Sequence, residues 1–242
     1  MTLKRADVIL HERGFFESRA KARAAIESGL VSVDGCVVTK PSAPIAQTAK
    51  IIATAPHPWV SRGGVKLDHA LKHFSVDPAG RYCIDVGAST GGFTDVLLAS
   101  NARHVVAVDV GRDQLHPKLR KDPRVTFLEA QDIRTLEPGR LTETPSLVVV
   151  DASFISLTSL LASITGLAAG EAELVALIKP QFEAGRGATK KGVVRDEQIH
   201  VVVCARVVAA LQELGWRVSG VIPSPIAGGD GNREFLLHSA RL

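Results

Sequence analysis

The amino-acid sequence predicts an α/β protein, in which a small N-terminal α/β domain precedes a larger, doubly wound and mostly parallel sheet. Three observations support this fold class. From Arg81 onward, short apolar runs rich in valine and isoleucine recur, and segments of helical length separate several of them. Two helical stripes and an Asp34-Gly35 turn come before these runs. Between them, positions 56–64 contain two prolines and two glycines without periodicity, which indicates a linker.

Composition and charge exclude several classes of protein. Hydrophobic residues make up 45% and charged residues 22% of the 242 positions, as in an ordinary globular protein. No segment has the unbroken apolar length of a membrane helix, and the charged start Met1–Asp7 argues against a standard export signal. The three cysteines lie far apart, which argues against a disulfide framework and a zinc site. We therefore expect a cytoplasmic protein without a metal, and the net charge of +4 gives only a weak indication of nucleic acid.

The segment 1–55 begins with two expected helices. Apolar residues within Leu3–Arg13 form a rough helical stripe, which Gly14 ends. Ser18 is the expected N-cap of a second helix, which covers Arg19–Glu27.

A hairpin and a basic helix face complete this segment. Alternating apolar residues flank Asp34-Gly35 within Leu30–Val38, and this pattern is the strongest short hairpin signal. The basic residues either form an ordinary solvated face or contact nucleic acid. The candidates for such contacts are Arg5, Arg19, Lys21 and Arg23.

The order of helix, basic helix and Gly-Leu-Val-x-Val-Asp-Gly hairpin resembles the small RNA-binding domain named after ribosomal small-subunit protein four. The match extends from Glu17-Ser18-Arg19 to Val33-Asp34-Gly35. The resemblance implies that the basic helix face and the hairpin bind structured RNA.

A glycine-rich loop over 85–94, Asp-Val-Gly-Ala-Ser-Thr-Gly-Gly-Phe-Thr, ends the first strand of the larger domain and opens a helix. Glycines let the backbone approach a ligand closely, and a helix N-terminus offers unpaired N–H groups. The spacing does not fit the dinucleotide fingerprint, and the Gly-Lys-Ser/Thr end of a P-loop is absent. Ser89 formally satisfies the Gly-x-Ser-x-Gly nucleophile elbow of hydrolases, but that elbow follows several strands and this loop follows the first.

S-adenosylmethionine (SAM) is the ligand that remains. Asp85 is placed to face its amino-acid end, Asp109 its ribose hydroxyls and Asp132 its adenine amino group. Each aspartate alone is also consistent with a helix cap, but three carboxylates at successive strand ends favour a ligand. The sequence therefore predicts a Rossmann-like class I methyltransferase sheet. Its expected cofactor contacts are Asp85, Gly87, Ser89, Gly91, Gly92, Phe93, Asp109 and Asp132.

Four charged residues favour chemistry on an alcohol. Lys66 lies in an expected helix, Asp151 and Lys179 each follow an apolar run, and Glu234 opens another. Each alone is typical of a solvated strand end. Together they suit methylation of a ribose 2′-hydroxyl, because a lysine oriented by carboxylates can hydrogen-bond or deprotonate this weakly acidic group. The reaction requires no metal, and the sequence contains no cluster of metal-ligand spacing.

The Lys-Asp-Lys-Glu tetrad of the FtsJ-like RNA 2′-O-methyltransferases is matched in full by Lys66, Asp151, Lys179 and Glu234. With the RNA-binding head, the glycine loop and the motifs Ser61-Arg62-Gly63-Gly64 and Lys179-Pro180-Gln181-Phe182-Glu183, the whole chain resembles the TlyA family. This resemblance implies a SAM-dependent ribosomal RNA cytidine 2′-O-methyltransferase, with ribosomal RNA or ribosomal subunits as partners. It also implies that Lys179 is the residue nearest the 2′-hydroxyl.

Two other functions stay open. One is a non-catalytic RNA-binding or ribosome-assembly factor, and the other is a membrane-active hemolysin, which the family's older name suggests. For the apolar helix expected over Glu197–Leu214, packing on a sheet is a better explanation than membrane insertion. The sequence does not predict an oligomeric state.

We divide the chain into an RNA-binding domain over 1–55, a linker over 56–64 and a methyltransferase domain over 65–242. The loop 181–192 is either an ordinary surface loop or a strap that contacts substrate phosphates. The RNA contacts expected outside the N-terminal domain are Arg62, Arg186, Lys190 and Lys191.

Overall fold

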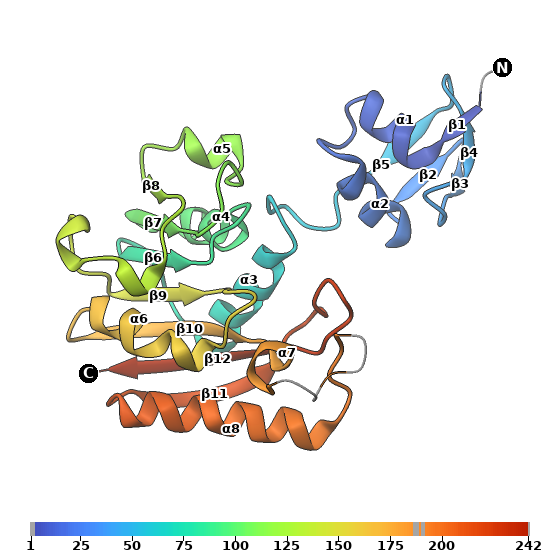
Figure 1. Ribbon diagram of the computed structural model, residues 1–242. Coiled ribbons are helices and arrows are strands. Elements are labelled where there is room, and N and C mark those ends of the chain that lie inside the picture. Colours follow the sequence, from blue (N-terminus) through green and yellow to red (C-terminus); the bar gives the residue numbers. More distant parts are fainter. Residues whose placement is uncertain (1–2, 186–188, 190–191, 242) are drawn as a thin grey trace. The chain divides into compact units, whose positions relative to one another are not determined.

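The structure is a computed structural model that describes residues 3–185, 189 and 192–241 (Figure 1). It divides the chain into two compact units, unit 1 over Met1–Pro58 and unit 2 over Trp59–Leu242. The predicted fold class is confirmed, because unit 1 is a small α/β domain and unit 2 contains a large sheet with helices on both faces.

Unit 1 consists of two helices and two small antiparallel sheets. The elements are β1 (Leu3–Arg5), α1 (Ala6–Glu12), α2 (Arg19–Glu27), β2 (Val31–Val33), β3 (Cys36–Val37), β4 (Pro44–Ala46) and β5 (Ile51–Ala53). Strand β1 pairs with β4, and β2 pairs with both β3 and β5. The apolar sides of both helices pack with β2 in one core, to which Ile9, Ile26 and Val31 belong.

The cap and the hairpin of unit 1 are confirmed, whereas its first helix begins later than predicted. The Ser18 side chain accepts the Lys21 backbone N–H, and Asp34 and Gly35 turn the chain with φ of 49° and 83°. The stripe predicted from Leu3 includes a strand, since Leu3–Arg5 pairs with Pro44–Ala46 before α1 begins. Hydrogen bonds to a distant strand thus override the local helical pattern in these three residues.

Unit 2 contains a seven-stranded sheet in the order β11-β12-β10-β9-β6-β7-β8. Its strands are β6 (Tyr82–Val86), β7 (His104–Val108), β8 (Val125–Leu128), β9 (Leu147–Val150), β10 (Ala172–Ile178), β11 (Arg217–Pro223) and β12 (Phe235–Arg241). The pairs from β10 to β8 are parallel, and β12 is antiparallel to both of its neighbours. The carboxyl ends of β6, β7, β9 and β10 therefore meet at one edge of the sheet, where such folds bind ligands.

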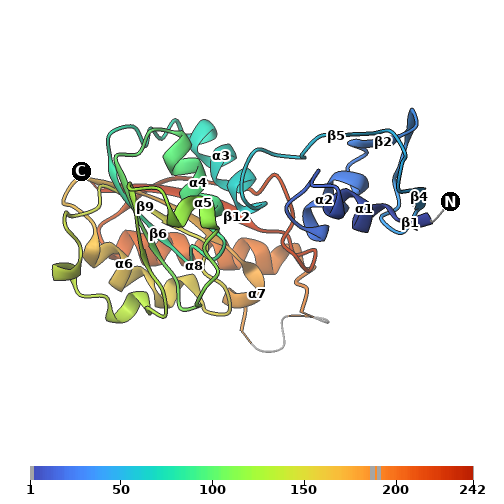
Figure 2. The ribbon, with the colours of Figure 1, turned by 90° about the horizontal axis from the view of Figure 1, so that it is seen from above.

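Helices cover both faces of this sheet (Figure 2). They are α3 (Gly63–Phe74), α4 (Gly92–Ala99), α5 (Pro117–Arg120), α6 (Leu161–Leu167), α7 (Pro180–Glu183) and α8 (Glu197–Glu213), with short 3-10 turns η1 (Ile133–Thr135), η2 (Pro138–Arg140) and η3 (Leu157–Ser159). Alternate residues of each strand enter opposite cores, so that Leu147 and Val149 pack with α3 and α4, and Val148 and Val150 pack with α6 and α8. Burial on both faces explains the continuous apolar runs in the sequence.

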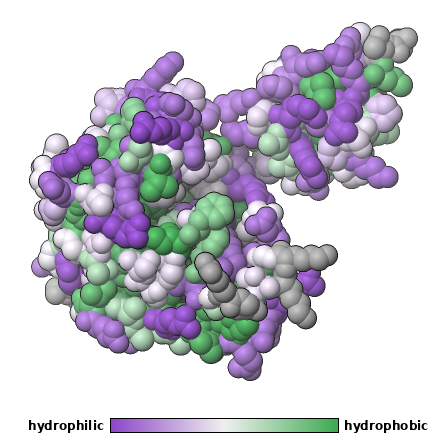
Figure 3. Space-filling view, in the orientation of Figure 1, coloured by the Kyte–Doolittle hydropathy of each residue, from purple (hydrophilic) through white to green (hydrophobic). Residues whose placement is uncertain are grey.

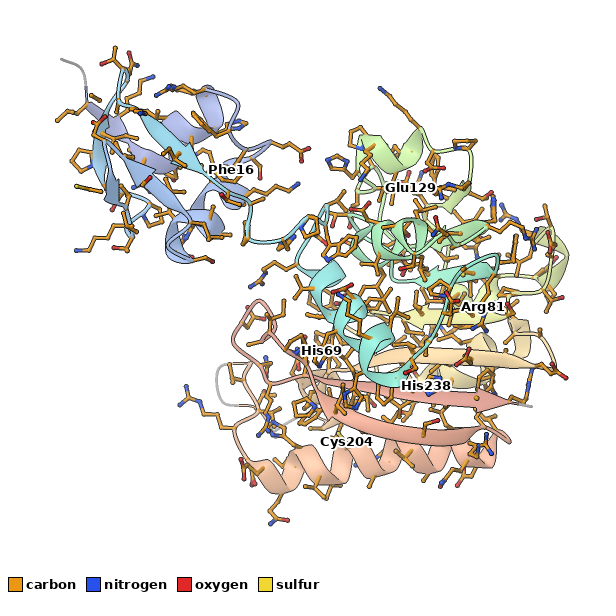
Figure 4. The ribbon with its side chains drawn as sticks, turned by 180° about the vertical axis from the view of Figure 1, so that it is seen from behind. Phe16, His69, Arg81, Glu129, Cys204 and His238 are labelled. Atoms are coloured by element: carbon orange, nitrogen blue, oxygen red, sulfur yellow. The ribbon has the colours of Figure 1, made fainter. Side chains whose placement is uncertain are left out.

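A polar network joins β6, β10 and β12 near the amino ends of β6 and β10. Arg81, just before β6, forms an ion pair with Glu173 near the start of β10. His238 of β12 lies with its Nε2 atom 3.0 Å from Glu173 Oε1, and Figure 4 labels both Arg81 and His238. We infer that this network stabilises the sheet and takes no part in the candidate site.

Much of the predicted linker belongs to unit 2. Helix α3 already begins at Gly63. Val60 is buried, and the backbone N–H of Val60 donates a hydrogen bond of 2.9 Å to the buried Asp95 carboxylate. Trp59 packs so closely on Gly64 that a Cβ atom built there would lie 2.4 Å from the indole Cγ. Residues 59–64 are thus folded onto α3 and α4, although proline and glycine suggested an irregular connection.

We expect Gly64→Ala to lower the free energy of unfolding of unit 2 by about 1–3 kcal/mol, because the added methyl group overlaps Trp59. Urea denaturation followed by tryptophan fluorescence measures the change. Gly139→Ala is the matched control, since a Cβ atom there meets nothing within 4 Å. Equal stability of the two variants would contradict the packing of Trp59 on this helix.

Candidate active site

The glycine loop joins β6 to α4 and touches the end of β9. Gly87 and Gly91 have φ of +81° and +92°, which favour glycine. A Cβ atom on Gly87 would lie 2.8 Å from the Asp151 carbonyl oxygen, and one on Gly91 would lie 2.2 Å from Leu119 Cδ1. Glycine at these two positions therefore allows the loop to lie directly against its neighbours.

Asp85, at the end of β6, is fully buried and fixes the start of α4. Its Oδ2 atom accepts hydrogen bonds from the backbone N–H and the hydroxyl of Thr94, at 2.9 and 2.6 Å. Its Oδ1 atom is buried and has no hydrogen-bond partner among the described residues. Burial raises the pKa of this carboxyl to about 7 against the hydrogen bonds of Thr94, which lower it.

A cavity of about 530 Å³ opens at the carboxyl ends of β6, β7 and β9. Four of the predicted cofactor contacts line it, namely Gly87, Ser89, Asp109 and Asp132. The other four are outside its wall and shape the loop or the core, namely Asp85, Gly91, Gly92 and Phe93. Phe93 in particular is buried among apolar side chains of α3 and α4.

Two aspartates of the cavity wall also bond the backbone. Asp109 accepts from the N–H groups of Ser89 and Gly111, both at 2.7 Å, and so joins the glycine loop to the end of β7. Asp132 caps η1 and forms an ion pair of 2.5 Å with Arg134, whose hydrogen bonds lower the pKa of the Asp132 carboxyl. Asp109 keeps further lone pairs for a ligand, whereas both oxygens of Asp132 already accept hydrogen bonds from Arg134.

The hydroxyl of Ser89 donates a hydrogen bond to Gln114 Oε1 at 3.0 Å. Among the described contacts of Ser89 none involves a histidine, although a hydrolytic serine needs such a base within hydrogen-bond reach. The nucleophile-elbow interpretation therefore has no support in this geometry.

The four residues of the predicted tetrad form two buried ion pairs. Lys66 Nζ lies 2.5 Å from Glu234 Oε2, and Lys179 Nζ lies 2.6 Å from Asp151 Oδ1. Each lysine is 8% exposed, which is rare for lysine unless a carboxylate compensates its charge. Gly63, one turn before Lys66, is close to Asp151, since a Cβ atom there would lie 3.6 Å from Asp151 Oδ2. Helix α3 thus begins beside the end of β9.

Two residues of this region were missed from the sequence. Ser153 accepts a hydrogen bond of 2.6 Å from Lys179 Nζ and lines the cavity. Phe154, also on the cavity wall, is 91% exposed with φ of +65°, and its ring centroid lies 5.4 Å from that of Phe182. A bulky residue in this backbone region is uncommon and points to function. The only signal in the sequence is that both residues directly follow the strand end at Asp151.

The predicted RNA contacts of unit 1 fall into two sets. Arg5 and Arg19 both pair with the buried Asp7, whereas Lys21 and Arg23 each pair with an exposed glutamate four residues away. Hydrophilic side chains cover most of the face of unit 1 seen in Figure 3. In unit 2, Arg62 precedes α3, and Arg186, Lys190 and Lys191 lie outside the described residues.

Neither a group of metal ligands nor a membrane-spanning helix is found in the part of the chain that the structure describes. Within the described ranges no three histidine, cysteine, aspartate or glutamate residues are grouped to hold a metal ion. Among the helices of the same ranges none is long and apolar enough to cross a membrane.

Asp85 makes the stability of unit 2 depend on pH. Its carboxyl ionises near 3.8 in the unfolded chain and near 7 in the folded protein, so the folded state binds the extra proton between these values. The contribution of Asp85 to the free energy of unfolding therefore falls as pH rises from about 4 to 7. Asp85→Asn cannot ionise, and we expect its stability relative to wild type to increase across this window in urea denaturation. If the free energy of unfolding changed with pH in the same way for wild type and Asp85→Asn, this prediction would be contradicted. Asp77→Asn is the control, because Asp77 is exposed.

Comparison with known proteins gives close relatives and a shared fold. The 16S/23S rRNA (cytidine-2′-O)-methyltransferase TlyA of Mycobacterium tuberculosis is 44% identical over 236 residues, which cover 96% of this chain and 88% of that relative. A solved Streptococcus thermophilus protein with a provisional hemolysin name is 41% identical, with a TM-score of 0.79 over 100% of this chain and 89% of the other. A SAM-dependent methyltransferase of Aquifex aeolicus is 19% identical with a TM-score of 0.53, and the match covers 75% of this chain and 94% of the other. At this identity the comparison shows likeness of fold alone.

Two family models match in the same order as the two units. The S4 domain model matches residues 4–49, and the FtsJ-like methyltransferase model matches residues 59–241. These matches confirm the resemblance that the sequence motifs carry. The chain therefore belongs to the FtsJ-like methyltransferase family and bears an S4 domain at its N-terminal end.

Proposed function

We propose that this protein transfers the methyl group of SAM to a ribose 2′-hydroxyl. The acceptor is the ribose of a cytidine in ribosomal RNA. The observation that carries the proposal is the pair of buried lysine–carboxylate contacts at strand ends, one of which reaches the cavity through Asp151. The membership of the family and the name of the M. tuberculosis relative support the reaction and its substrate. A ribosomal substrate implies that the protein works in the cytoplasm.

The residues at the cavity fit SAM. Asp109, on the cavity wall, has lone pairs for ribose hydroxyls. Asp85 lies outside that wall, and its buried Oδ1 atom, which has no described partner, is the candidate acceptor for the ammonium group of the amino-acid end. Gly87 lines the cavity with backbone alone, and Asp132 is the candidate acceptor for the adenine amino group. The volume of the cavity is in the range of small-molecule sites.

When bound, SAM supplies an electrophilic methyl group on a positively charged sulfur. The protein must hold the 2′-oxygen in line with that group and remove its proton, since proximity and orientation provide a large part of such an acceleration. In its amine form, Lys179 Nζ would accept the hydroxyl proton while the 2′-oxygen bonds to the methyl carbon and the bond from that carbon to the sulfur breaks, so that the sulfur leaves as a neutral thioether. The resulting ammonium is held by Asp151 and Ser153, and this is the arrangement of the three side chains in the structure. Lys66 and Glu234 form the supporting pair.

The acceptor side of the cavity suits a nucleotide. Phe154 exposes an aromatic face beside Ser153, and bases of single-stranded RNA commonly stack on such rings. The S4 domain supplies the cations that an RNA backbone requires. We therefore assign the acceptor to an unpaired nucleotide of a structured RNA, in agreement with a ribosomal substrate.

Lys179→Ala tests the proposed function. We expect methyl transfer to fall by roughly 10²–10⁴-fold, the usual contribution of a general base, while SAM binding is retained because Lys179 is not on the cavity wall. The measurement is transfer of labelled methyl from SAM to ribosomal RNA and to purified subunits, followed by mapping of 2′-O-methyl sites.

Lys72→Ala is the control, since Lys72 is exposed on α3 and pairs with Asp68. No transfer by the wild type to any ribosomal substrate would favour a non-catalytic RNA-binding factor. Methylation of a base instead of a ribose would overturn the assignment of the tetrad.

Ser153→Ala tests whether Ser153 positions Lys179. Loss of a hydrogen bond to a charged group typically costs on the order of 1.5–3 kcal/mol, so kcat is expected to fall about tenfold or more with KM for RNA unchanged. Ser153→Thr keeps the hydroxyl and should restore most of kcat. Equal kcat in all three proteins would exclude this role.

A further inference from the structure

Glu183, the last residue of α7, is a buried acidic residue that the proposed reaction does not use. It is 5% exposed, and it forms no ion pair within the part of the chain that the structure describes. Its carboxylate accepts hydrogen bonds from the hydroxyl of Ser156 at 2.7 Å, from the hydroxyl of Thr158 at 3.4 Å and from the backbone N–H of Leu157. These donors compensate the burial of the acidic group. All three belong to η3 or its N-cap, so the carboxylate holds the start of η3 against α7.

The residues that Glu183 holds follow directly after a segment of the cavity wall. This wall segment, residues 152–155, connects the end of β9 to the N-cap of η3, and all four of its residues line the cavity. At the β9 end, the backbone N–H of Asp151 donates to the Val86 carbonyl oxygen at 2.9 Å. At the η3 end, the carboxylate of Glu183 accepts the hydrogen bonds just described. The wall segment is therefore held at both of its ends.

The backbone of Phe154, in the middle of the wall segment, needs this support. Its φ of +65° costs free energy for a bulky residue and persists only where the surrounding structure fixes it. The side chain is 91% exposed, so its own burial provides little of the required stabilisation. Ala152 and Ile155 pack partly against the core, which is one source of support. Helix α7 is the other.

Helix α7 contacts the wall segment in register, residue after residue. Lys179, at its N-cap, donates to the Ser153 hydroxyl at 2.6 Å, and the Phe182 ring centroid lies 5.4 Å from that of Phe154. The carboxylate of its last residue then holds η3. The helix itself is fixed from its other side in the sequence, because Arg206 of α8 donates a hydrogen bond of 3.0 Å to the carbonyl oxygen of that last residue.

We propose that Glu183 is a positioning residue for the acceptor side of the active site. It holds the wall segment 152–155 so that the Ser153 hydroxyl meets Lys179 and Phe154 presents its ring to the substrate nucleotide. Glu183 does not line the cavity, so its effect on methyl transfer runs through these two residues. The inference rests on the proposed function, which gives Ser153 and Phe154 their roles.

Hydrogen–deuterium exchange of the full chain, without SAM or RNA, tests whether Glu183 holds the wall segment. Glu183→Ala removes the acceptor of the Leu157 N–H, and we expect residues 152–158 to exchange about tenfold faster than in wild type. Chymotrypsin should also cleave faster after the exposed Phe154. Glu183→Gln keeps one acceptor oxygen, so its exchange rate should lie between those of wild type and Glu183→Ala.

Glu173→Gln is the matched control. Glu173 is a glutamate of the same sheet, pairs with Arg81 and His238, and does not line the cavity. Its substitution should lower the free energy of unfolding of unit 2 and leave both the exchange of residues 152–158 and methyl transfer unchanged. The comparison thus separates loss of stability from loss of position.

Methyl transfer in two backgrounds tests whether Glu183 acts through the wall segment. At saturating SAM we expect Glu183→Ala to lower kcat/KM for ribosomal subunits about tenfold. In a protein that already carries Ser153→Ala and Phe154→Ala, the same substitution should cost less than about twofold, because the side chains that it positions are gone. A merely structural role would lower kcat/KM equally in both backgrounds.

A milder variant decides if Glu183→Ala does not fold. Ser156→Ala removes one of the three donors to Glu183 and should raise the exchange of residues 152–158 by a smaller factor. Ser159→Ala is its control and should leave the exchange unchanged, since the Ser159 hydroxyl donates to the Ser156 carbonyl oxygen and not to Glu183.

The outcomes separate this inference from the proposed function. Wild-type exchange of residues 152–158 in folded Glu183→Ala, or in Ser156→Ala where Glu183→Ala does not fold, overturns the positioning role. An equal loss of methyl transfer in the two backgrounds also overturns it. If the wild type transfers no methyl group to any ribosomal substrate, the proposed function fails, and the exchange and cleavage rates still decide whether Glu183 holds the wall segment.

Discussion

The candidate site depends on the close approach of the glycine loop to the end of β9. Strands β6 and β9 are neighbours in the sheet, and the loop that follows β6 passes over the backbone of Asp151. A Cβ atom on Gly87 would lie 2.8 Å from the Asp151 carbonyl oxygen, so any side chain there would push the loop and the strand apart. Such a shift would open the cavity and also displace the carboxylate that holds Lys179. One missing side chain therefore couples the ligand cavity to the lysine beside it.

Carboxylates that accept backbone N–H groups make this arrangement rigid. Asp85 bonds Thr94 at the start of α4, Asp109 bonds Ser89 and Gly111, and Asp132 caps η1. Each aspartate thus has the capping role that was the alternative to ligand binding. For Asp85 and Asp109 the two roles are compatible, because a carboxylate has about four lone-pair positions and each of these two accepts only two hydrogen bonds. A ligand at Asp132 would have to compete with Arg134, which bonds both of its oxygens. A side chain whose direction is already fixed loses little entropy when a ligand arrives, which is how preorganised sites obtain their electrostatic effect.

The sequence predicted the large sheet well because its strands are buried on both faces. The apolar runs predicted after Arg81 are observed as strands, among them Tyr82–Val86, His104–Val108 and Leu147–Val150, because these runs are continuous and lie between helical segments. Strand β1 was missed because its three residues were included in the helical stripe predicted over Leu3–Arg13, and their partner Pro44–Ala46 lies far along the chain. Residues 59–64 were assigned to a linker because the contacts of Trp59 and Val60 with α3 and α4 are tertiary.

The sequence allowed a prediction for those site residues whose type and place beside a strand suggest their chemistry. Lys66, Asp151, Lys179 and Glu234 could be named because buried strands end just before Asp151 and Lys179 and another begins just after Glu234. That they form two separate pairs, and that Ser153 completes one, required coordinates. Phe93 illustrates the opposite case, because its place in a ligand-binding motif did not reveal that its side chain fills the core.

A net charge of only +4 is compatible with RNA chemistry because charge is compensated differently in the two units. At the candidate active site every lysine of the tetrad has its own carboxylate, so the site is close to neutral and gains little by attracting phosphates. Its lysines can then act on an uncharged hydroxyl without being occupied by the RNA backbone. In unit 1 the helix residues Lys21 and Arg23 are likewise neutralised by glutamates. The surplus charge lies on Arg5 and Arg19, which share Asp7, and on Arg13, Lys40 and Lys50, which have no ion pair within the described residues. Mean charge is therefore a poor guide to RNA binding in this protein, since affinity depends on the few cations that lack a carboxylate of their own.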